Sequence, residues 1–410
     1  MTKEFFNVTP VARVFELISA FEPVETETVD LLEATGRILA EDVISDIDLP
    51  GFDRSTMDGY AVRAADTFGA SEGNPAYLTI RGSIPMGTRP DRSVGPGEAV
   101  RIATGGMMPE GADGVTMIEH AAEIGGETLE VYKRIAPGTH VVKRDEDIGK
   151  HARVLAAGTP IRPQETGILA ALGKSRVTVY RRPVVGIIST GDELVAIDRE
   201  PAPGRIRDVN TYTLAGAVSA AGGIPRIYGI VFDIFEPLLA AAEQALTETD
   251  AVLLSGGSSV GTRDLTVEVI GAMPGAEILV HGIPVRPGKP TILARIGGKA
   301  FWGLPGHVTS ALVIFEKFVR PFIGQIGGNR LFFENHFGIP AVLTRNLASA
   351  QGRIDCVRVR LTEKDGIYYA EPVLGPSGLI RTLVEADGLI EIDMNTEGLV
   401  KGTVVRVFPV

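Results

Sequence analysis

The clearest pattern in the chain is an alternation of apolar runs and longer helix-like segments between residues 179 and 327. The runs 183–189 (PVVGIIS) and 250–256 (DAVLLSG) predict buried strands, and the segments 211–223 and 236–249 predict helices. We expect further strands at 224–231, 276–280 and 300–305 and further helices at 265–271 and 309–323. This alternation favours an α/β fold with a doubly wound, mostly parallel sheet and helices on both faces. Asn210 is the candidate N-cap of the helix at 211–223, and Gly222 is its candidate C′ residue.

The flanking regions have different patterns. Apolar residues from Val11 to Phe21 recur at helical spacing, and we expect a second short helix at 29–43 that buries Leu31, Leu32 and Ile38. Residues 45–141 are dense in glycine and proline with short alternating runs, which predicts a small β domain. A helix is expected at 162–173, and residues 142–178 are expected to pack back on the N-terminal segment, so that the β region is an insertion. Residues 331–410 predict a terminal β module.

Composition narrows the class of protein. The chain has 410 residues, which predicts two to four domains, and a net charge of −11. The hydrophobic content of 44%, with 49 glycines and 26 prolines, indicates packed, turn-rich domains and disfavours disorder, a coiled coil and a non-specific nucleic-acid binder. The single cysteine, Cys356, excludes an internal disulfide and a multi-thiolate metal site. With no signal-peptide pattern and no membrane-spanning apolar run, we expect a cytoplasmic protein without membrane contact.

Three strand ends carry candidate chemistry, because ligands of open α/β sheets bind beyond the carboxyl ends of strands. In 187–194 (IISTGDEL), Asp192 and Glu193 could hold a divalent cation, or they form an acidic surface turn. In 253–266 (LLSGGSSVGTRDLT), the glycines could admit an anion and Asp264 could bind Mg²⁺, whereas the alternative is a long flexible turn. In 302–310 (WGLPGHVTS), Ser310 could contact an anion or simply cap a helix.

A basic loop lies between the last two of these segments. In 281–291 (HGIPVRPGKPT), three prolines brace Arg286 and Lys289 and so stiffen the loop that carries the two cations. No acidic residue occurs from Ile278 to Phe315. This window predicts a local positive field suited to phosphate or another oxyanion.

Some short motifs leave other functions open. The loop around 282–290 fails as a Walker A loop, because its glycine spacing is wrong and Pro290 stands where a hydroxyl should hold Mg²⁺. The run GSSVG at 257–261 matches the nucleophile pattern G-x-S-x-G, so a serine hydrolase using Ser259, with His281 or His307 as base, is an alternative. Cys356 and Trp302 are interpreted as packing residues.

Several motifs taken together and in order resemble one family, the molybdopterin molybdenumtransferases, or molybdenum insertases, related to the E domain of gephyrin. The resemblance covers essentially the whole chain. It rests on FDRSTMDGYAV, RIATGGMMPEGAD, KRDEDI, GIISTGDEL, VNTYTL, LLSGGSSVGTRD, VRPGKP and LPGHVTSALVIFEKFVRP.

The resemblance implies a fold and a reaction. The implied domains are an elongated discontinuous domain (1–44 and 142–178), an inserted β domain (45–141), an α/β domain (179–327) and a C-terminal β-barrel-like domain (328–410). It implies a homodimer whose cleft lies between the α/β and C-terminal domains of one subunit and the inserted β domain of the other. The implied enzyme inserts molybdate into adenylylated molybdopterin, releases AMP and needs Mg²⁺. We expect the molybdopterin adenylyltransferase that supplies this substrate to be a partner, and we expect no nucleic-acid partner.

The resemblance also assigns residues. The family's functional acids fall on Asp58, Asp147, Glu193, Asp233 and Asp264. Of these, Glu193 and Asp264 are expected to hold Mg²⁺. The candidates for substrate binding are Thr104, Gly256, Gly257, Ser258, Gly261, Arg286, Lys289, Ser310, Arg358 and Ser377, with Ser310, Arg358 and Ser377 expected near molybdate.

The chain departs from the family pattern at two places. His307 and Val308 replace the Asn-Pro of the usual Gly-Asn-Pro-Val-Ser loop, and Arg286 replaces the first lysine of the Lys-Pro-Gly-Lys loop. Arginine keeps the charge of lysine but changes its hydrogen-bond geometry. A tungstate-inserting paralogue is therefore an alternative, and a non-catalytic scaffold is a further one.

Overall fold

The computed structural model of the protein describes residues 8–257, 265–329 and 337–409. The chain folds into two compact units. Unit 1 comprises Met1–Glu41, Ala157–Pro163 and Arg176–Val410, and unit 2 comprises Asp42–Ala156 and Gln164–Ser175. The division into four domains stays a prediction.

A six-stranded sheet in unit 1 confirms the predicted α/β fold. Its strands in spatial order are β17 (Ile224–Val231), β14 (Val184–Thr190), β18 (Ala251–Ser255), β22 (Lys299–Leu304), β21 (Ile292–Ile296) and β19 (Glu277–His281). The first four strands pair in parallel, and β21 and β19 complete the sheet in antiparallel pairs. The continuous apolar runs of β14 and β18 follow from this arrangement, because both faces of a central parallel strand are covered.

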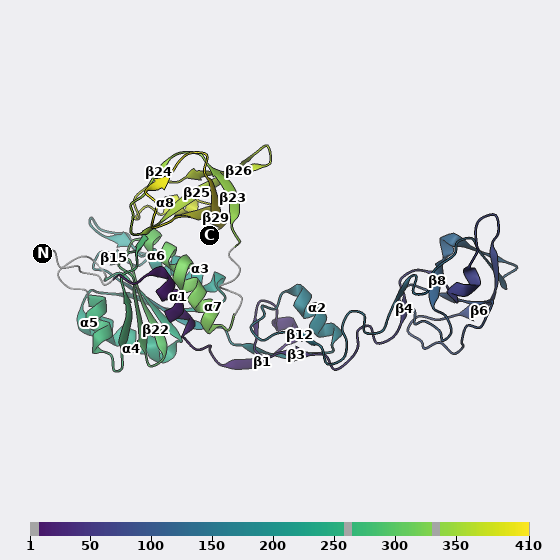
Figure 1. Ribbon diagram of the computed structural model, residues 1–410. Coiled ribbons are helices and arrows are strands. Elements are labelled where there is room, and N and C mark those ends of the chain that lie inside the picture. Colours follow the sequence, from purple (N-terminus) through teal and green to yellow (C-terminus); the bar gives the residue numbers. More distant parts are fainter. Residues whose placement is uncertain (1–7, 258–264, 330–336, 410) are drawn as a thin grey trace. The chain divides into compact units, whose positions relative to one another are not determined.

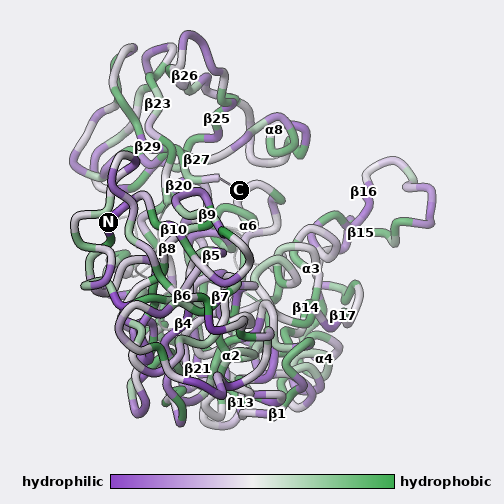
Figure 2. The backbone as a smooth tube through the Cα atoms, turned by 90° about the vertical axis from the view of Figure 1, so that its right-hand side faces the viewer, coloured by the Kyte–Doolittle hydropathy of each residue, from purple (hydrophilic) through white to green (hydrophobic). Residues whose placement is uncertain are grey.

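Helices cover both faces of this sheet (Figure 1). Helices α1 (Val11–Ser19), α3 (Asn210–Ala220), α6 (Val308–Ile314) and α7 (Arg320–Ile326) share one core with Ile187, Leu253 and Trp302. Helices α4 (Phe235–Glu248) and α5 (Leu265–Ala272) share a second core with Ile188, Leu254 and Phe301. Neighbouring residues of one strand thus face opposite cores, as strand geometry requires. In Figure 2 the hydrophobic colour follows β14 and the helices α3 and α4.

Two details of these helices differ from the sequence prediction. Val209 is the N-cap of α3, and Asn210 is its first helical residue. The buried side-chain amide of Asn210 does not cap the helix. Instead, the backbone N–H of Thr211 donates to Asp208 Oδ1 at 3.1 Å. Gly222, with φ of +87°, has the left-handed conformation of a C′ residue, as predicted. The helix expected at 309–323 is interrupted by a π-helical segment, η4 (Phe315–Val319), between α6 and α7.

The C-terminal region closes into a small β-barrel (Figure 1), as the resemblance implied. Its strands are β25 (Ile354–Lys364), β26 (Ile367–Pro372), β23 (Ile339–Leu343), β29 (Val404–Pro409) and β27 (Gly388–Ile392), and β27 pairs back onto β25. A short strand, β20 (Val285–Arg286), leaves the α/β part and adds to β25 in parallel. This pairing joins the basic loop of the α/β part to the barrel. The region also contains β24 (Leu347–Ala348), β28 (Gly398–Leu399) and α8 (Arg381–Val384).

Unit 2 contains the predicted small β domain. Its six-stranded sheet has the order β8 (Gly114–Met117), β5 (Gly59–Val62), β7 (Glu98–Ile102), β6 (Ala76–Ser83), β10 (Thr128–Val131) and β9 (Ala121–Ile124). Two apolar clusters, one around Val62 and Leu129 and one around Val100 and Val115, pack against the sheet. A two-stranded ribbon of β4 (Arg54–Ser55) and β11 (Val141–Val142) connects the two ends of the segment that carries this sheet.

The segment at 29–43 corrects the sequence prediction, because it is not helical. Strand β1 (Thr26–Asp30) and the single turn η1 (Leu31–Glu33) precede β2 (Ile38–Leu39), and Leu32 is 94% exposed. The reason is long-range pairing: β13 (Arg176–Tyr180) pairs with both β1 and β2. Sheet pairing here outweighs local helical spacing.

The segment after the β domain returns to the N-terminal part of the chain, as expected. Strand β12 (Arg153–Leu155) pairs with β3 (Val43–Ile44), and α2 (Pro163–Ala171) forms at the predicted position. No helix in the described part of the chain is long and apolar enough to cross a membrane.

Candidate functional site

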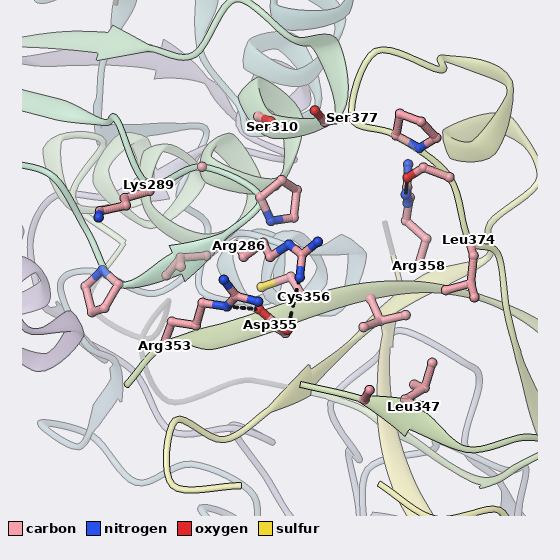
Figure 3. Close-up of a pocket in the computed structure, with 18 of the residues that line it drawn as sticks. Arg286, Lys289, Ser310, Leu347, Arg353, Asp355, Cys356, Arg358, Leu374 and Ser377 are labelled. Carbon is pink, nitrogen blue, oxygen red and sulfur yellow. Dashed lines mark hydrogen bonds and ion pairs between the residues drawn. The ribbon is translucent and has the colours of Figure 1, made fainter. Parts of the chain in front are cut away.

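A pocket of about 850 Å³ opens in unit 1 between the basic loop and the barrel. One side is the loop at 284–290, called the loop wall below. The other side, called the barrel wall, consists of residues 353–358 of the barrel and the segment 373–377. Five predicted substrate-binding residues line this pocket (Figure 3): Arg286, Lys289, Ser310, Arg358 and Ser377.

The loop wall is held close to helix α6. Gly288 has φ of +128°, and a Cβ atom there would lie 2.4 Å from the side chain of Ile314. Only glycine fits this conformation and this close approach. The hydroxyl of Thr291 donates to the carbonyl of Gly288 at 2.7 Å and fixes the loop from its other side. The prediction of a stiff loop carrying Arg286 and Lys289 thus has a packing basis.

Arg358 is the buried cation of the barrel wall. Its side chain donates to three acceptors: Thr309 Oγ1 at 3.2 Å, Thr382 Oγ1 at 2.5 Å and the carbonyl of Gly375 at 2.8 Å. Burial lowers the pKa of Arg358 from its ordinary value, although arginine stays charged at neutral pH. A guanidinium held in this way presents its remaining N–H groups in a fixed direction.

The sequence analysis missed two charged residues of the barrel wall that line the pocket, Arg353 and Asp355. Arg353 donates from Nε to Asp355 Oδ1 at 2.9 Å, and Ser349 Oγ donates to Asp355 Oδ2 at 3.0 Å. Arg286 of the loop wall lies 3.9 Å from the same carboxylate, and Figure 3 shows both arginines turned toward it. Asp355 is buried, and its carboxylate contacts one arginine from each wall, so it links the two walls. The available signal was an acid at an inward position of the alternating strand at 354–361.

Figure 3 shows the side chains of Ser310 and Ser377 at the top of the pocket, and the backbone N–H of Thr309, next to Ser310, donates to the carbonyl of Ser377 at 3.1 Å. Ser310 belongs to the first turn of α6 and is buried. Ser377 Oγ lies 2.8 Å from Nδ1 of His307, the residue that precedes α6. Four cationic side chains, two serine hydroxyls and the single carboxylate of Asp355 therefore line the pocket, which makes it suited to an oxyanion.

The carboxyl edge of the parallel sheet adjoins this region through the loop before α6. Asn210 donates from Nδ2 to Ser255 Oγ at 2.6 Å and to the carbonyl of Gly306 at 2.7 Å. It thereby joins the ends of β18 and β22. Gly256 follows β18 with φ of +111°, and a Cβ atom there would meet the carbonyl oxygen of Thr190 at 2.0 Å.

Predicted acids also lie at this edge. Thr190 Oγ1 donates to Asp233 Oδ1 at 2.6 Å, which joins the ends of β14 and β17. Glu193 lies just beyond Thr190 and is exposed. Gly257 ends the described part of the next loop. Ser258, Gly261 and Asp264, together with Ser259 of the hydrolase alternative, lie outside the described residues.

Three predicted residues belong to unit 2. The backbone N–H and the hydroxyl of Thr104 donate to Asp58 Oδ1 at 2.7 and 3.0 Å. These hydrogen bonds lower the pKa of Asp58 from its ordinary value, so this carboxylate is ionised at neutral pH. Asp147 lies in an exposed segment whose backbone bonds to the carbonyl of Leu49 at 3.1 Å. The structure thus brings Thr104 and Asp58 together within unit 2.

Sequence models of protein families match this chain over most of its length. Residues 9–173 match the MoeA N-terminal region (domain I and II), and residues 340–410 match the MoeA C-terminal region (domain IV). Residues 186–325 match a model described as "Probable molybdopterin binding domain".

Relatives give the same result. A molybdopterin molybdenumtransferase of Bacillus subtilis is 36% identical over 93% of this chain and 89% of its own length. One of Haemophilus influenzae is 33% identical over 94% of each chain. The crystal structure of a molybdopterin biosynthesis MoeA protein from Pyrococcus horikoshii OT3 is 31% identical, covers 98% of this chain and 100% of its own, and has a TM-score of 0.85. The chain belongs to the MoeA family.

Proposed function

We propose that this protein acts in molybdenum cofactor biosynthesis as a molybdopterin molybdenumtransferase. It inserts molybdate into adenylylated molybdopterin and releases AMP. The observation that carries the proposal is the convergence of Arg286, Lys289, Ser310, Arg358 and Ser377 on one pocket. Molybdate and a pyrophosphate-linked ligand are both multiply anionic, and fixed cations offset their mutual repulsion.

The two walls have different tasks in this reaction. The barrel wall and the two serines bind molybdate, because Arg358, Ser310 and Ser377 offer donors in fixed directions. Arg286 and Lys289 of the loop wall, with Gly256 and Gly257 at the sheet edge, bind the phosphates. The residues position both anions and stabilise the charge on the transferred group, which is the main requirement in phosphate chemistry.

Glu193, the described carboxylate at the sheet edge, is of a residue type that binds Mg²⁺. Among the described residues, no three His, Cys, Asp or Glu side chains gather as a metal cage. Mg²⁺ is usually held by one or two carboxylates together with substrate phosphates, so a complete protein cage is not required. We assign the metal to Glu193 and Asp264. A bound Mg²⁺ would neutralise negative charge on the linked phosphates of adenylylated molybdopterin. Asp233 keeps its hydrogen bond from Thr190 and shapes this edge.

Further parts of the proposal concern assembly and location. The ionised Asp58 beside Thr104, together with Asp147, would complete the cleft of the partner subunit in a homodimer. A molybdopterin adenylyltransferase would supply the adenylylated substrate. The protein would work in the cytoplasm, with no nucleic acid or membrane involved.

The test is AMP release by the purified protein with Mg²⁺, molybdate and adenylylated molybdopterin. We expect release that depends on molybdate and falls in Asp264→Ala. Absence of molybdate-dependent release would overturn the proposal. Full activity of Asp264→Ala would remove that residue from the metal site.

Three alternatives give different outcomes. A scaffold would release no AMP. A serine hydrolase would be labelled by a fluorophosphonate probe at Ser259, and the label would be lost in Ser259→Ala. A tungstate-specific paralogue would prefer tungstate over molybdate in the AMP assay. We do not favour it, because the relatives are named for molybdenum.

A further inference from the structure

His307 is outside the lining of the pocket but contacts a residue that belongs to it. Its Nδ1 lies 2.8 Å from Ser377 Oγ, while Ser377, and not His307, lines the pocket. His307 stands at the junction of β22 and α6, where the family pattern has asparagine. The contact is therefore a feature of this chain that the family resemblance does not explain.

The backbone around Ser377 is fixed by contacts other than that with His307. The backbone N–H of Thr309 donates to the carbonyl of Ser377 at 3.1 Å. Arg358 Nη2 donates to the carbonyl of Gly375 at 2.8 Å. With the segment held at both points, the direction of the Ser377 O–H bond is what the His307 ring can still change.

This direction matters for an oxyanion. A serine hydroxyl has one hydrogen, and an oxyanion accepts hydrogen bonds but donates none. If Nδ1 of His307 accepts the serine hydrogen, the lone pairs of Oγ are what remains for a ligand. If Nδ1 carries a hydrogen and donates it to Oγ, the O–H of Ser377 is released toward the ligand. Either arrangement is open to a histidine, because its ring nitrogens exchange roles with the tautomer.

We propose that His307 is a positioning residue that turns the hydroxyl of Ser377 toward a bound tetrahedral oxyanion by donating from Nδ1. This inference rests on the proposed function, because it takes molybdate as the oxyanion of this pocket. It adds a determinant of molybdate affinity that lies outside the pocket lining. Asparagine could donate from its amide without a change of tautomer, so His307→Asn is the conservative variant.

The first experiment compares molybdate binding in His307→Leu, His307→Asn, Ser377→Ala and the double variant His307→Leu/Ser377→Ala by titration calorimetry. We expect His307→Leu to weaken molybdate binding about tenfold, the effect of one lost hydrogen bond of ordinary strength. Ser377→Ala should lose a similar factor, the double variant should be no worse than Ser377→Ala, and His307→Asn should recover most of the affinity. His120→Leu, in unit 2, is the matched control and should bind as the wild type does. In AMP release, His307→Leu should raise KM for molybdate with little change in kcat.

The second experiment observes the ring directly in the wild-type protein labelled with ¹⁵N-histidine. The Nδ1 resonance of His307, assigned by its loss in His307→Asn, should move to the protonated range when molybdate is added. The same change should be absent in Ser377→Ala. This measurement tests the inference even if His307→Leu fails to fold, because a merely structural histidine would show no such response.

The outcomes separate this inference from the proposed function. Molybdate affinity and KM unchanged in His307→Leu, with wild-type AMP release intact, would overturn the inference and leave the function standing. Equal and additive losses in the double variant would also overturn it. Molybdate binding that depends on His307, without AMP release by the wild type, would support the inference and overturn the function. A wild type that binds no molybdate would overturn both.

Discussion

The two walls of the pocket carry arginines of opposite character. On the barrel wall, Arg358 is 8% exposed and donates to three acceptors. On the loop wall, the side chain of Arg286 is 64% exposed, and its contact with Asp355 is long at 3.9 Å. A buried, hydrogen-bonded guanidinium defines geometry in a low-dielectric environment, whereas an exposed one contributes charge that solvent and salt screen. Residues that look equivalent in the sequence therefore have unequal roles in the folded protein.

The largest expected effect is the loss of Arg358. Arg358→Ala removes the buried cation and its hydrogen bonds to Gly375, Thr309 and Thr382. We expect kcat/KM for molybdate-dependent AMP release to fall about 100-fold, or about 2.7 kcal/mol, and the free energy of unfolding to fall by about 2 kcal/mol. Steady-state kinetics and denaturant unfolding measure the two effects.

Arg358→Lys sharpens the same comparison. Lysine keeps the charge but cannot serve three acceptors in the planar arrangement of a guanidinium. Its activity should therefore stay closer to that of Arg358→Ala than to that of the wild type. Near wild-type kinetics of Arg358→Lys would show that charge alone matters on the barrel wall.

The second effect concerns Asp355, the carboxylate between the walls. Asp355→Asn weakens the hydrogen bonds from Arg353 and Ser349, and we expect it to lower the free energy of unfolding by about 1–3 kcal/mol. KM for molybdate should change less than threefold, because the buried donors of Arg358 remain in place. Denaturant unfolding measures this, with Glu363→Gln, an exposed carboxylate of the same strand, as control. Equal stability of the two variants would contradict the role given to Asp355.

A smaller effect is expected for Arg286 on the loop wall. Arg286→Ala should raise the KM for adenylylated molybdopterin, whose phosphates Arg286 is proposed to bind, about fivefold at low ionic strength. The difference from the wild type should fade as salt is added, because the charge of Arg286 is exposed. Arg286→Lys should stay near the wild type, in contrast to Arg358→Lys. KM measured over a salt series checks this, and a fivefold loss that persists at high salt would contradict it.

The smallest effect concerns Cys356, which is buried beside Asp355. Burial raises the pKa of its thiol to about 12, so the nucleophilic thiolate is scarce at neutral pH. We expect iodoacetamide at pH 8 to label the native protein negligibly and the unfolded protein fully, as mass spectrometry would show. Rapid labelling of the native protein would contradict the burial of this thiol in the barrel wall.

The sequence predicted those parts of the fold that depend on local periodicity. The apolar runs of β14 and β18 and the helices between them were recognisable because their spacing reflects burial on fixed faces. The helix predicted at 29–43 was wrong, because β1 and β2 in this segment pair with β13, a strand distant in the chain. The prediction of Asn210 as the N-cap of α3 was wrong, because its side-chain amide instead donates hydrogen bonds near the ends of two strands, β18 and β22.

The site was predictable to a similar extent. A window without acids pointed to Arg286 and Lys289, the strand end at 302–310 pointed to Ser310, and the family resemblance supplied Arg358 and Ser377. Arg353 and Asp355 were missed because their importance depends on the addition of β20 to β25, which places Arg286 beside Asp355. No local pattern in the chain shows that register.

The most direct test of the central claim is a crystal of this protein soaked with molybdate and measured for anomalous scattering from molybdenum. We predict a single strong peak in the pocket, within hydrogen-bond reach of Arg358, Ser310 and Ser377. A molybdenum peak elsewhere in the protein, with no peak in this pocket, would contradict the account.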